Sequence, residues 1–221
     1  MDIDLPKLRQ WIGHSESVTD ILAPSPPHAL AALLDRDDPA PAVGDRLPAC
    51  WQWLYFLPAP KHAEIGPDGH PQRGGFLPPV PLARRMWAGS RLHFAASLKI
   101  GQLCTRVSRI VEVDHKVGQS GPLVFVKVRH EIGAQGVAAV IEEQDLVYRD
   151  VPPSAAALAP SVAAPQACDW SRDMRADPAL LFQFSALTLN GHRIHYDPMM
   201  PRISCELAGQ RLKCVRTSAI R

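Results

Sequence analysis

Three stretches decide the fold: QLCTRVSRIVEV at 102–113, PLVFVKVRHEI at 122–132 and AAVIEEQDLVY at 138–148. All three are long and rich in β-branched residues, and short glycine-containing turns, GQSG at 118–121 and GAQG at 133–136, join them. Such a pattern predicts a meander of antiparallel strands. The sequence also favours shorter strands at 51–57 and 91–95.

Helical patterns precede these strands. Apolar residues recur at helical spacing from Leu5 to Ile12, and the segment 15–22 could continue this helix or restart it before Pro24. Ser25 is a suitable N-cap for a second helix, whose run HALAALL at 28–34 is nearly all apolar. Because such a helix cannot lie on an open surface, we expect the sheet to curl over it in an α+β fold.

Proline is the unusual residue, with 22 in 221 positions, about twice average usage. Seven prolines between Pro58 and Pro81 exclude a helix or a central strand there and predict a long, stiff loop. We expect this loop to be ordered because it has apolar side chains to pack, namely Ile65, Phe76, Leu77, Val80 and Leu82. A second stretch at 151–167, rich in proline and alanine, is typical of an interdomain linker.

Composition excludes several classes of protein. A formal charge of only +2 gives no field that would concentrate nucleic acid, so we expect no nucleic-acid partner. No apolar run approaches the roughly 20 residues that span a bilayer, and the acidic start at Asp2 and Asp4 is unlike a signal peptide. We therefore expect a cytoplasmic protein without a membrane partner. Five scattered cysteines predict neither a disulfide framework nor a zinc site.

The histidines carry the strongest chemical signal. Seven of the nine stand alone and are expected to be structural or exposed. His192 and His195 instead share a polar turn with Asn190 and Asp197, directly after the apolar run LLFQFSALTL at 180–189, which predicts a strand. An imidazole can transfer protons near neutral pH, although these polar residues could equally satisfy one another. A metal site of His192, His195 and Asp197 would lack a recognisable fourth ligand, so we expect no metal.

Longer motifs then indicate a family. The segment FSALTLNGHRIHYD at 184–197 resembles the hydratase motif of MaoC-like enoyl-thioester hydratases and dehydratases, which have the hot-dog fold. Within them it is most similar to the branch related to fungal fatty-acid-synthase dehydratase domains. Further segments resemble the same branch, namely WQWLYF at 51–56, RGGFLPP at 73–79, RRMWAG at 84–89, SGPLVFV at 120–126 and EEQD at 142–145.

This resemblance implies a double hot-dog, in which only the C-terminal half keeps catalytic side chains. The implied reaction is hydration of an α,β-unsaturated acyl-CoA, with mesaconyl-C4-CoA giving citramalyl-CoA as the expected case, and it needs no cofactor. The motif places His195 as the proton-transfer residue, while Asn190, at the position of the family's acid, would orient water or the thioester. His192 could supply a second imidazole, and Asp197 could fix the tautomer of a neighbouring histidine.

Arg84 and Arg85 follow the proline-rich loop and could meet CoA phosphates, although a solvated basic pair is an equal alternative. Two other functions stay open: a 3-hydroxyacyl-thioester dehydratase running the reverse reaction, and a silent module that only binds acyl-CoA or pairs with a partner.

The expected organisation is an N-terminal non-catalytic hot-dog at 1–150, a linker at 151–167, the start of a catalytic hot-dog at 168–197 and an atypical tail at 198–221. After Asp197 the resemblance would require a glycine-rich helix and further strands, which the tail does not contain. We therefore expect an incomplete second hot-dog, whose exposed sheet edge would favour a homo-oligomer, such as a dimer.

Overall fold

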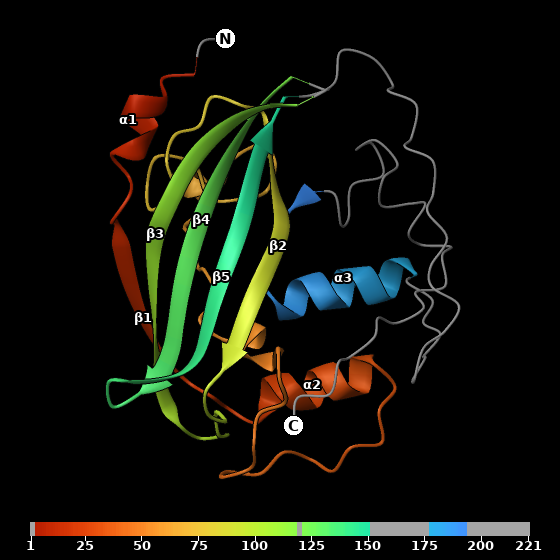
Figure 1. Ribbon diagram of the computed structural model, residues 1–221. Coiled ribbons are helices and arrows are strands. Elements are labelled where there is room, and N and C mark those ends of the chain that lie inside the picture. Colours follow the sequence, from red (N-terminus) through yellow and green to blue (C-terminus); the bar gives the residue numbers. More distant parts are fainter. Residues whose placement is uncertain (1–2, 119–120, 151–176, 194–221) are drawn as a thin grey trace, which may run out of the picture.

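A computed structural model describes residues 3–118, 121–150 and 177–193. Its centre is a five-stranded sheet in which every neighbouring pair is antiparallel, in the order β1-β3-β4-β5-β2 (Figure 1). The strands are β1 (Ser15–Ile21), β2 (Arg84–Phe94), β3 (Leu103–Gly118), β4 (Gly121–Ala134) and β5 (Val137–Arg149). The helices are α1 (Leu5–Arg9), α2 (Ser25–Leu33) and α3 (Pro178–Leu187), with 3-10 turns η1 (Trp51–Leu54) and η2 (His62–Glu64).

The three long strands of the meander are confirmed. Between β4 and β5, Gln135 and Gly136 have φ angles of 52° and 78°, as a type I′ hairpin turn requires. The predicted turn at 118–121 lies partly outside the described residues. The strand expected at 91–95 is longer than predicted, because β2 begins at Arg84 and passes an irregularity between Trp87 and Gly89.

Two predicted strands are wrong. Residues 51–57 begin with η1, since left-handed backbone at Cys50 and Phe56, with φ of 69° and 55°, prevents an extended segment. Residues 180–189 are mostly helical, because Asp177 caps α3 by accepting a hydrogen bond from the Leu180 N–H (2.9 Å), and Pro178 occupies its first turn.

The N-terminal helical predictions are confirmed in part. Residues 5–9 form α1, but Gly13, with φ of 93°, turns the chain, and residues 15–21 form β1 on the edge of the sheet rather than more helix. Helix α2 is present, with Pro24 rather than Ser25 at its N-cap.

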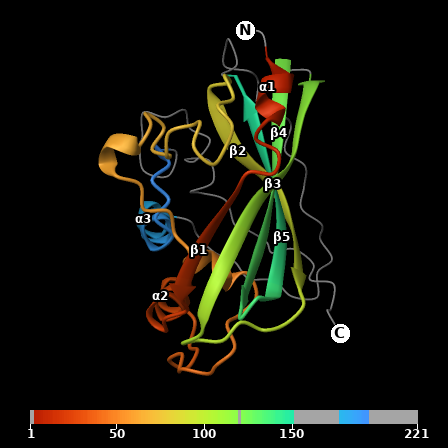
Figure 2. The same ribbon diagram turned by 90° about the vertical axis from the view of Figure 1, so that its left-hand side faces the viewer.

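The sheet does not enclose α2 as expected. Only one face of the helix is buried, through Pro27, Leu30 and Ala31, while His28 is exposed. Helix α2 contacts α3 and η1, and both helices lie on one side of the sheet (Figures 1 and 2). These apolar helices therefore cover one end of the inner face instead of filling a closed sheet.

The proline-rich loop is ordered by packing against the inner face. Val80 and Leu82 are buried in one cluster with Tyr148, and Phe76 and Leu77 pack against it, whereas Ile65 is exposed. The Arg73 guanidinium donates hydrogen bonds to the carbonyl oxygens of Val80 (2.9 Å), Leu82 and Ala83 (2.6 Å), and lies 5.5 Å from the centre of the Tyr148 ring. The order predicted for this loop is confirmed, with Ile65 as the exception.

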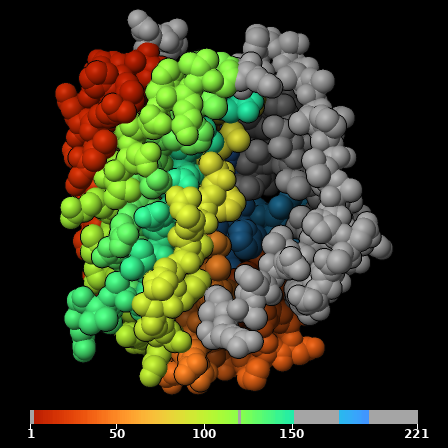
Figure 3. Space-filling model, viewed as in Figure 1, coloured from red at the N-terminus to blue at the C-terminus, as the bar shows by residue number. Residues whose placement is uncertain are grey.

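Strands β2 to β5 lie side by side on the face of the molecule that Figure 3 shows. This outer face of the sheet carries charged pairs. Lys127 pairs with Glu112 (2.5 Å), and Arg91 pairs with Asp145 (3.0 Å). Exposed pairs of this kind contribute little to stability and are typical of a solvated surface. The linker at 151–167 and the tail at 198–221 lie outside the described residues.

Candidate active site

The polar turn after α3 presents two of the predicted site residues. Leu189 has a left-handed φ of 47°, which ends the helix, and the Asn190 Oδ1 accepts a hydrogen bond from the backbone N–H of His192 (3.2 Å). Asparagine favours this local turn because its short side chain reaches the backbone two residues on. Asn190 and His192 are therefore held on a defined turn.

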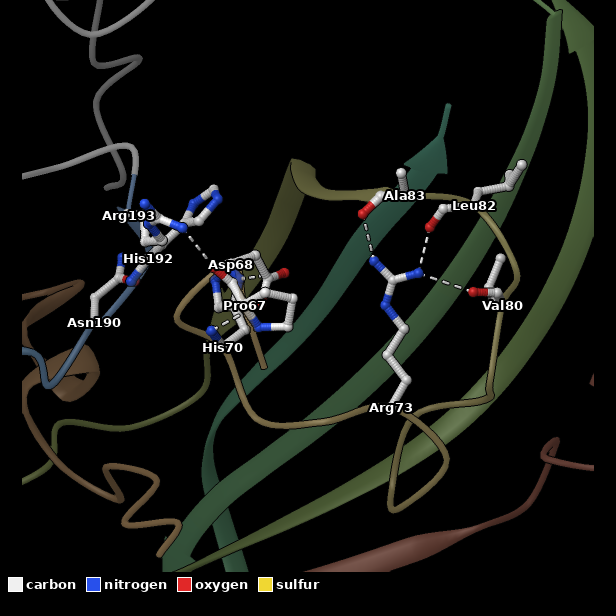
Figure 4. Close-up of polar contacts among 10 residues, drawn as sticks. All are labelled: Pro67, Asp68, His70, Arg73, Val80, Leu82, Ala83, Asn190, His192 and Arg193. Carbon is white, nitrogen blue, oxygen red and sulfur yellow. Dashed lines mark hydrogen bonds and ion pairs between the residues drawn. The ribbon is translucent and has the colours of Figure 1, made fainter. Parts of the chain in front are cut away.

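This turn docks on the proline-rich loop (Figure 4). The Arg193 N–H donates to the carbonyl oxygen of Asp68 (3.0 Å), and its guanidinium donates to that of Pro67 (3.2 Å). Gly69 makes the approach possible, because a Cβ there would lie only 1.8 Å from the Gly191 carbonyl oxygen. Two segments far apart in sequence thus meet through their backbones.

Two imidazoles come together at this junction. The rings of His70 and His192 have centroids 4.2 Å apart and are tilted by 35°. The Asp68 carboxylate lies 3.3 Å from Nδ1 of His70 and also accepts the His70 backbone N–H (3.1 Å). When Nδ1 donates to Asp68, the Nε2 of a neutral His70 is left as a proton acceptor.

Electrostatics keep His70 neutral. Burial and the charges of Arg85 and His192 together lower the pKa of His70 to about 4, against the opposing effect of Asp68. Burial would raise the pKa of Asp68, but the hydrogen bonds from His70 and the charge of Arg85 outweigh it and lower that pKa. Near neutral pH the junction therefore contains an ionised carboxylate beside a neutral imidazole.

The predicted site residues have different outcomes. Asn190 and His192 lie at the junction, and Arg85, at the start of β2, is close enough to influence Asp68 and His70. Arg84 is half-buried on the same strand, opposite Arg149. His195 and Asp197 lie outside the described residues.

His70 and Asp68 were not among the predicted site residues. Both belong to the turn PDGH at 67–70, which is itself a recognisable signal inside the proline-rich loop. Its proximity to His192 is a long-range contact that no local pattern reveals.

The surroundings of the junction are partly apolar. An open cavity of about 250 Å³ is lined by the end of α3 and the turn, namely Phe182, Ser185, Ala186, Leu189, Asn190 and Gly191. Within the described ranges, no three His, Cys, Asp or Glu residues are grouped as metal ligands. Among the same residues, no helix is long and apolar enough to cross a membrane.

Comparison with known proteins identifies the family. Residues 50–200 match the family model of hydroxyacyl-thioester dehydratase type 2. The chain belongs to this family. This chain is also 46% identical to the mesaconyl-C(4)-CoA hydratase of Chloroflexus aurantiacus. The alignment covers 85% of this chain and 67% of that relative.

Solved structures support the fold of this family member. A MaoC-like dehydratase aligns with a TM-score of 0.52 and 11% identity, covering 91% of this chain and 72% of the other. HtdX of Mycobacterium tuberculosis aligns with a TM-score of 0.50 and 11% identity, covering 90% and 72%. Together with the antiparallel sheet, these likenesses confirm the predicted α+β hot-dog fold.

Proposed function

We propose that this chain catalyses the reversible addition of water to an α,β-unsaturated acyl-CoA thioester, with mesaconyl-C4-CoA as substrate and citramalyl-CoA as product. The observation that carries the proposal is 46% identity to a hydratase of that substrate across 85% of the chain. A pair of imidazoles beside a carboxylate supplies proton-transfer chemistry suited to it.

The reaction needs two proton movements. A base takes a proton from water as its oxygen bonds to the β-carbon, and an acid delivers a proton to the α-carbon. Asn190 cannot serve as the base because an amide has no basic nitrogen, so it is assigned to orienting water or the thioester. We assign proton transfer to His195 and His192, as the motif implies, with Asp197 fixing a tautomer.

The N-terminal half adds a positioning residue to this scheme. His70 packs against His192, and its neutral state keeps a second positive charge away from that ring. Arg85 is assigned to the same junction, where its charge favours the anionic form of Asp68 and would favour a developing enolate oxygen. Arg84 stays a candidate for the CoA phosphates.

Turnover by variants tests these roles. We expect His195→Ala and His192→Ala each to lower kcat for mesaconyl-C4-CoA by about 100-fold or more, the range of general acid–base catalysis. His28→Ala, at an exposed position on α2, is the control and should keep the wild-type rate. Near-normal turnover by the His192→Ala, His195→Ala double variant would contradict the assignment.

The reverse reaction is the second candidate function. The matching family model describes a dehydratase of hydroxyacyl thioesters, which favours loss of water from a 3-hydroxyacyl chain. Comparing initial rates with citramalyl-CoA and with 3-hydroxyacyl-CoAs that lack the second carboxylate separates the two. A clear preference for the latter would replace mesaconyl-C4-CoA as the proposed substrate.

We also propose that the enzyme is cytoplasmic. Cys50 and Cys104 are free thiols, which suits the reducing cytoplasm.

The edge strands β1 and β2 offer surfaces for a second copy, so a homo-oligomer is expected. We propose an N-terminal non-catalytic hot-dog at 1–150 that is joined through residues 151–167 to the beginning of a catalytic one.

A further inference from the structure

A second cavity lies on the inner face of the sheet and is lined by both polar and apolar residues. Its volume is about 210 Å³, smaller than the roughly 300–1,000 Å³ of drug-sized ligand sites, which suits a short acyl group. Its lining includes Gln52 of η1, Arg106, His130, Glu142 and Thr188. Thr188 stands two positions before Asn190, so the segment that carries part of the candidate active site also contributes to this cavity.

Three ionisable residues of the strands lie on this mostly apolar inner face, namely Arg106, His130 and Glu142. His130 on β4 pairs directly with Glu142 on β5, and Arg106 lies on β3 two residues before Ser108, the partner of His130. Neighbours on the same face, such as Cys104 and Ile132, are buried and apolar. Charged residues are rare in such surroundings unless they have partners.

The acidic member of this group is already satisfied. Glu142 is 3% exposed and accepts hydrogen bonds from Trp53 Nε1 (2.9 Å) and Ser90 Oγ (2.6 Å), one on each carboxylate oxygen. His130 Nδ1 lies 2.9 Å from Ser108 Oγ. Glu142 therefore has no carboxylate oxygen without a hydrogen bond to offer the other donors in the lining of the cavity.

Two of these donors are unpaired. Gln52 is 2% exposed, and within the described part of the chain its Nε2 has no hydrogen-bond partner. The Nε of Arg106 likewise lacks a partner among those residues, and the nearest ion pair of this arginine, with the partly exposed Glu16, spans 3.7 Å. Buried donors left unpaired are costly, which indicates that a ligand oxygen belongs beside them.

Arg106 contributes a positive charge to the lining of the cavity. Burial lowers the pKa of Arg106, although Glu16 and Glu142 oppose this shift. The pKa of His130 is lowered by burial and by the charge of Arg106, and Glu142 opposes that shift. A carboxylate beside Arg106 would offset the cost of desolvating the guanidinium and would make protonation of His130 easier.

We propose that this cavity binds the free carboxylate of the acyl group, with Arg106 as its counterion and Gln52 as a second donor. The inference rests on the proposed function, because mesaconyl-C4-CoA carries a carboxylate on the β-carbon. Arg106 is then a specificity-determining residue that selects dicarboxyl thioesters over simple enoyl thioesters.

Binding of saturated analogues tests this without any turnover. The pair is 3-carboxybutyryl-CoA and isovaleryl-CoA, which differ only in that a methyl group replaces the carboxylate and which cannot be hydrated. We expect the full chain to bind the carboxylated analogue about 10- to 100-fold more tightly in calorimetric titrations, as for a buried charge pair.

Variants assign the preference to Arg106. Arg106→Met should abolish the preference while leaving the Kd for isovaleryl-CoA within about threefold, which also reports an intact cavity, and Arg106→Lys should retain part of it. Arg109→Met is the matched control, since Arg109 is an exposed residue of the same strand, and should keep the full preference.

The outcomes separate the two proposals. Equal affinities of the wild-type chain for both analogues, or a preference retained in Arg106→Met, would overturn the carboxylate site and leave hydration of an acyl-CoA intact. The carboxylate site would also be overturned if Arg106→Met no longer bound isovaleryl-CoA while Arg106→Lys kept the full preference for the carboxylated analogue. Failure of the wild-type chain to bind either CoA thioester would instead overturn the proposed function.

Discussion

His70 links the electrostatics of the junction to the stability of the protein. Its folded pKa of about 4 lies below the 6.5 of an unperturbed histidine, so between these values the unfolded chain binds more protons and stability falls as pH falls. We expect His70→Gln to remove up to about 3 kcal/mol of this pH dependence. Urea unfolding between about pH 7 and about pH 4 measures it.

The control for this prediction is His62→Gln, in the same loop but exposed. It should leave the pH dependence of the unfolding free energy unchanged. Identical slopes for the His70→Gln variant and the wild type would contradict the assignment of a neutral, buried imidazole.

Gly69 tests the contact between the loop and the turn after α3. Gly69→Ala adds a Cβ that would overlap the Gly191 carbonyl oxygen, at a residue whose φ is 86°. We expect a loss of stability of about 1–2 kcal/mol from backbone strain and a further loss of about 1–3 kcal/mol from the clash. Thermal unfolding measures the sum.

Gly74→Ala separates the two effects. Gly74 has a similar φ of 93°, but a Cβ there would meet nothing closer than Pro79 at 3.7 Å. It should therefore show the backbone strain alone. If both variants lose the same stability, the close approach of Gly69 and Gly191 is not part of the folded protein.

Single residues were predictable only where the signal is local. The turn after 189 marked Asn190 and His192, because polar side chains grouped after an apolar run are visible in the sequence. His70 and Arg106 were not found as site residues, since their roles depend on partners from distant segments.

The elements follow the same division. The strands of the meander could be predicted because β-branched residues and tight turns specify them locally, as at Gln135 and Gly136. Helix α3 differs from the predicted strand because an apolar run alone fits both kinds of element, and the helix start signal at Asp177 and Pro178 decides between them. The half-exposed position of α2 depends on its contact with α3, which the sequence does not reveal.

The hairpin between β4 and β5 offers a test at this scale. Gln135 holds a left-handed φ of 52°, which asparagine adopts at lower cost. We expect Gln135→Asn to stabilise the protein by about 0.5 kcal/mol, because Asn-Gly is the preferred type I′ pair. Chemical denaturation measures the gain, and Gln135→Ala is the control that should bring none. A destabilised Gln135→Asn variant would contradict the turn type.

At the scale of the whole molecule, the candidate site depends on joining distant parts of one chain. The loop at 58–81, the strands β3 to β5 and the segment at the end of α3 contribute to two regions, the imidazole pair and the cavity that Arg106 lines. Family membership explains the resemblance that the motifs indicated, while the catalytic assignment of His195 stays a prediction.

The most direct test of the proposed hydration uses mesaconyl-C4-CoA in water labelled with heavy oxygen, followed by mass spectrometry. We predict citramalyl-CoA with one labelled oxygen in its new hydroxyl group and an intact thioester. Absence of this product, or release of free CoA with the label in a carboxylate, would contradict the account, since the latter would mean that the chain hydrolyses the thioester instead of hydrating its double bond.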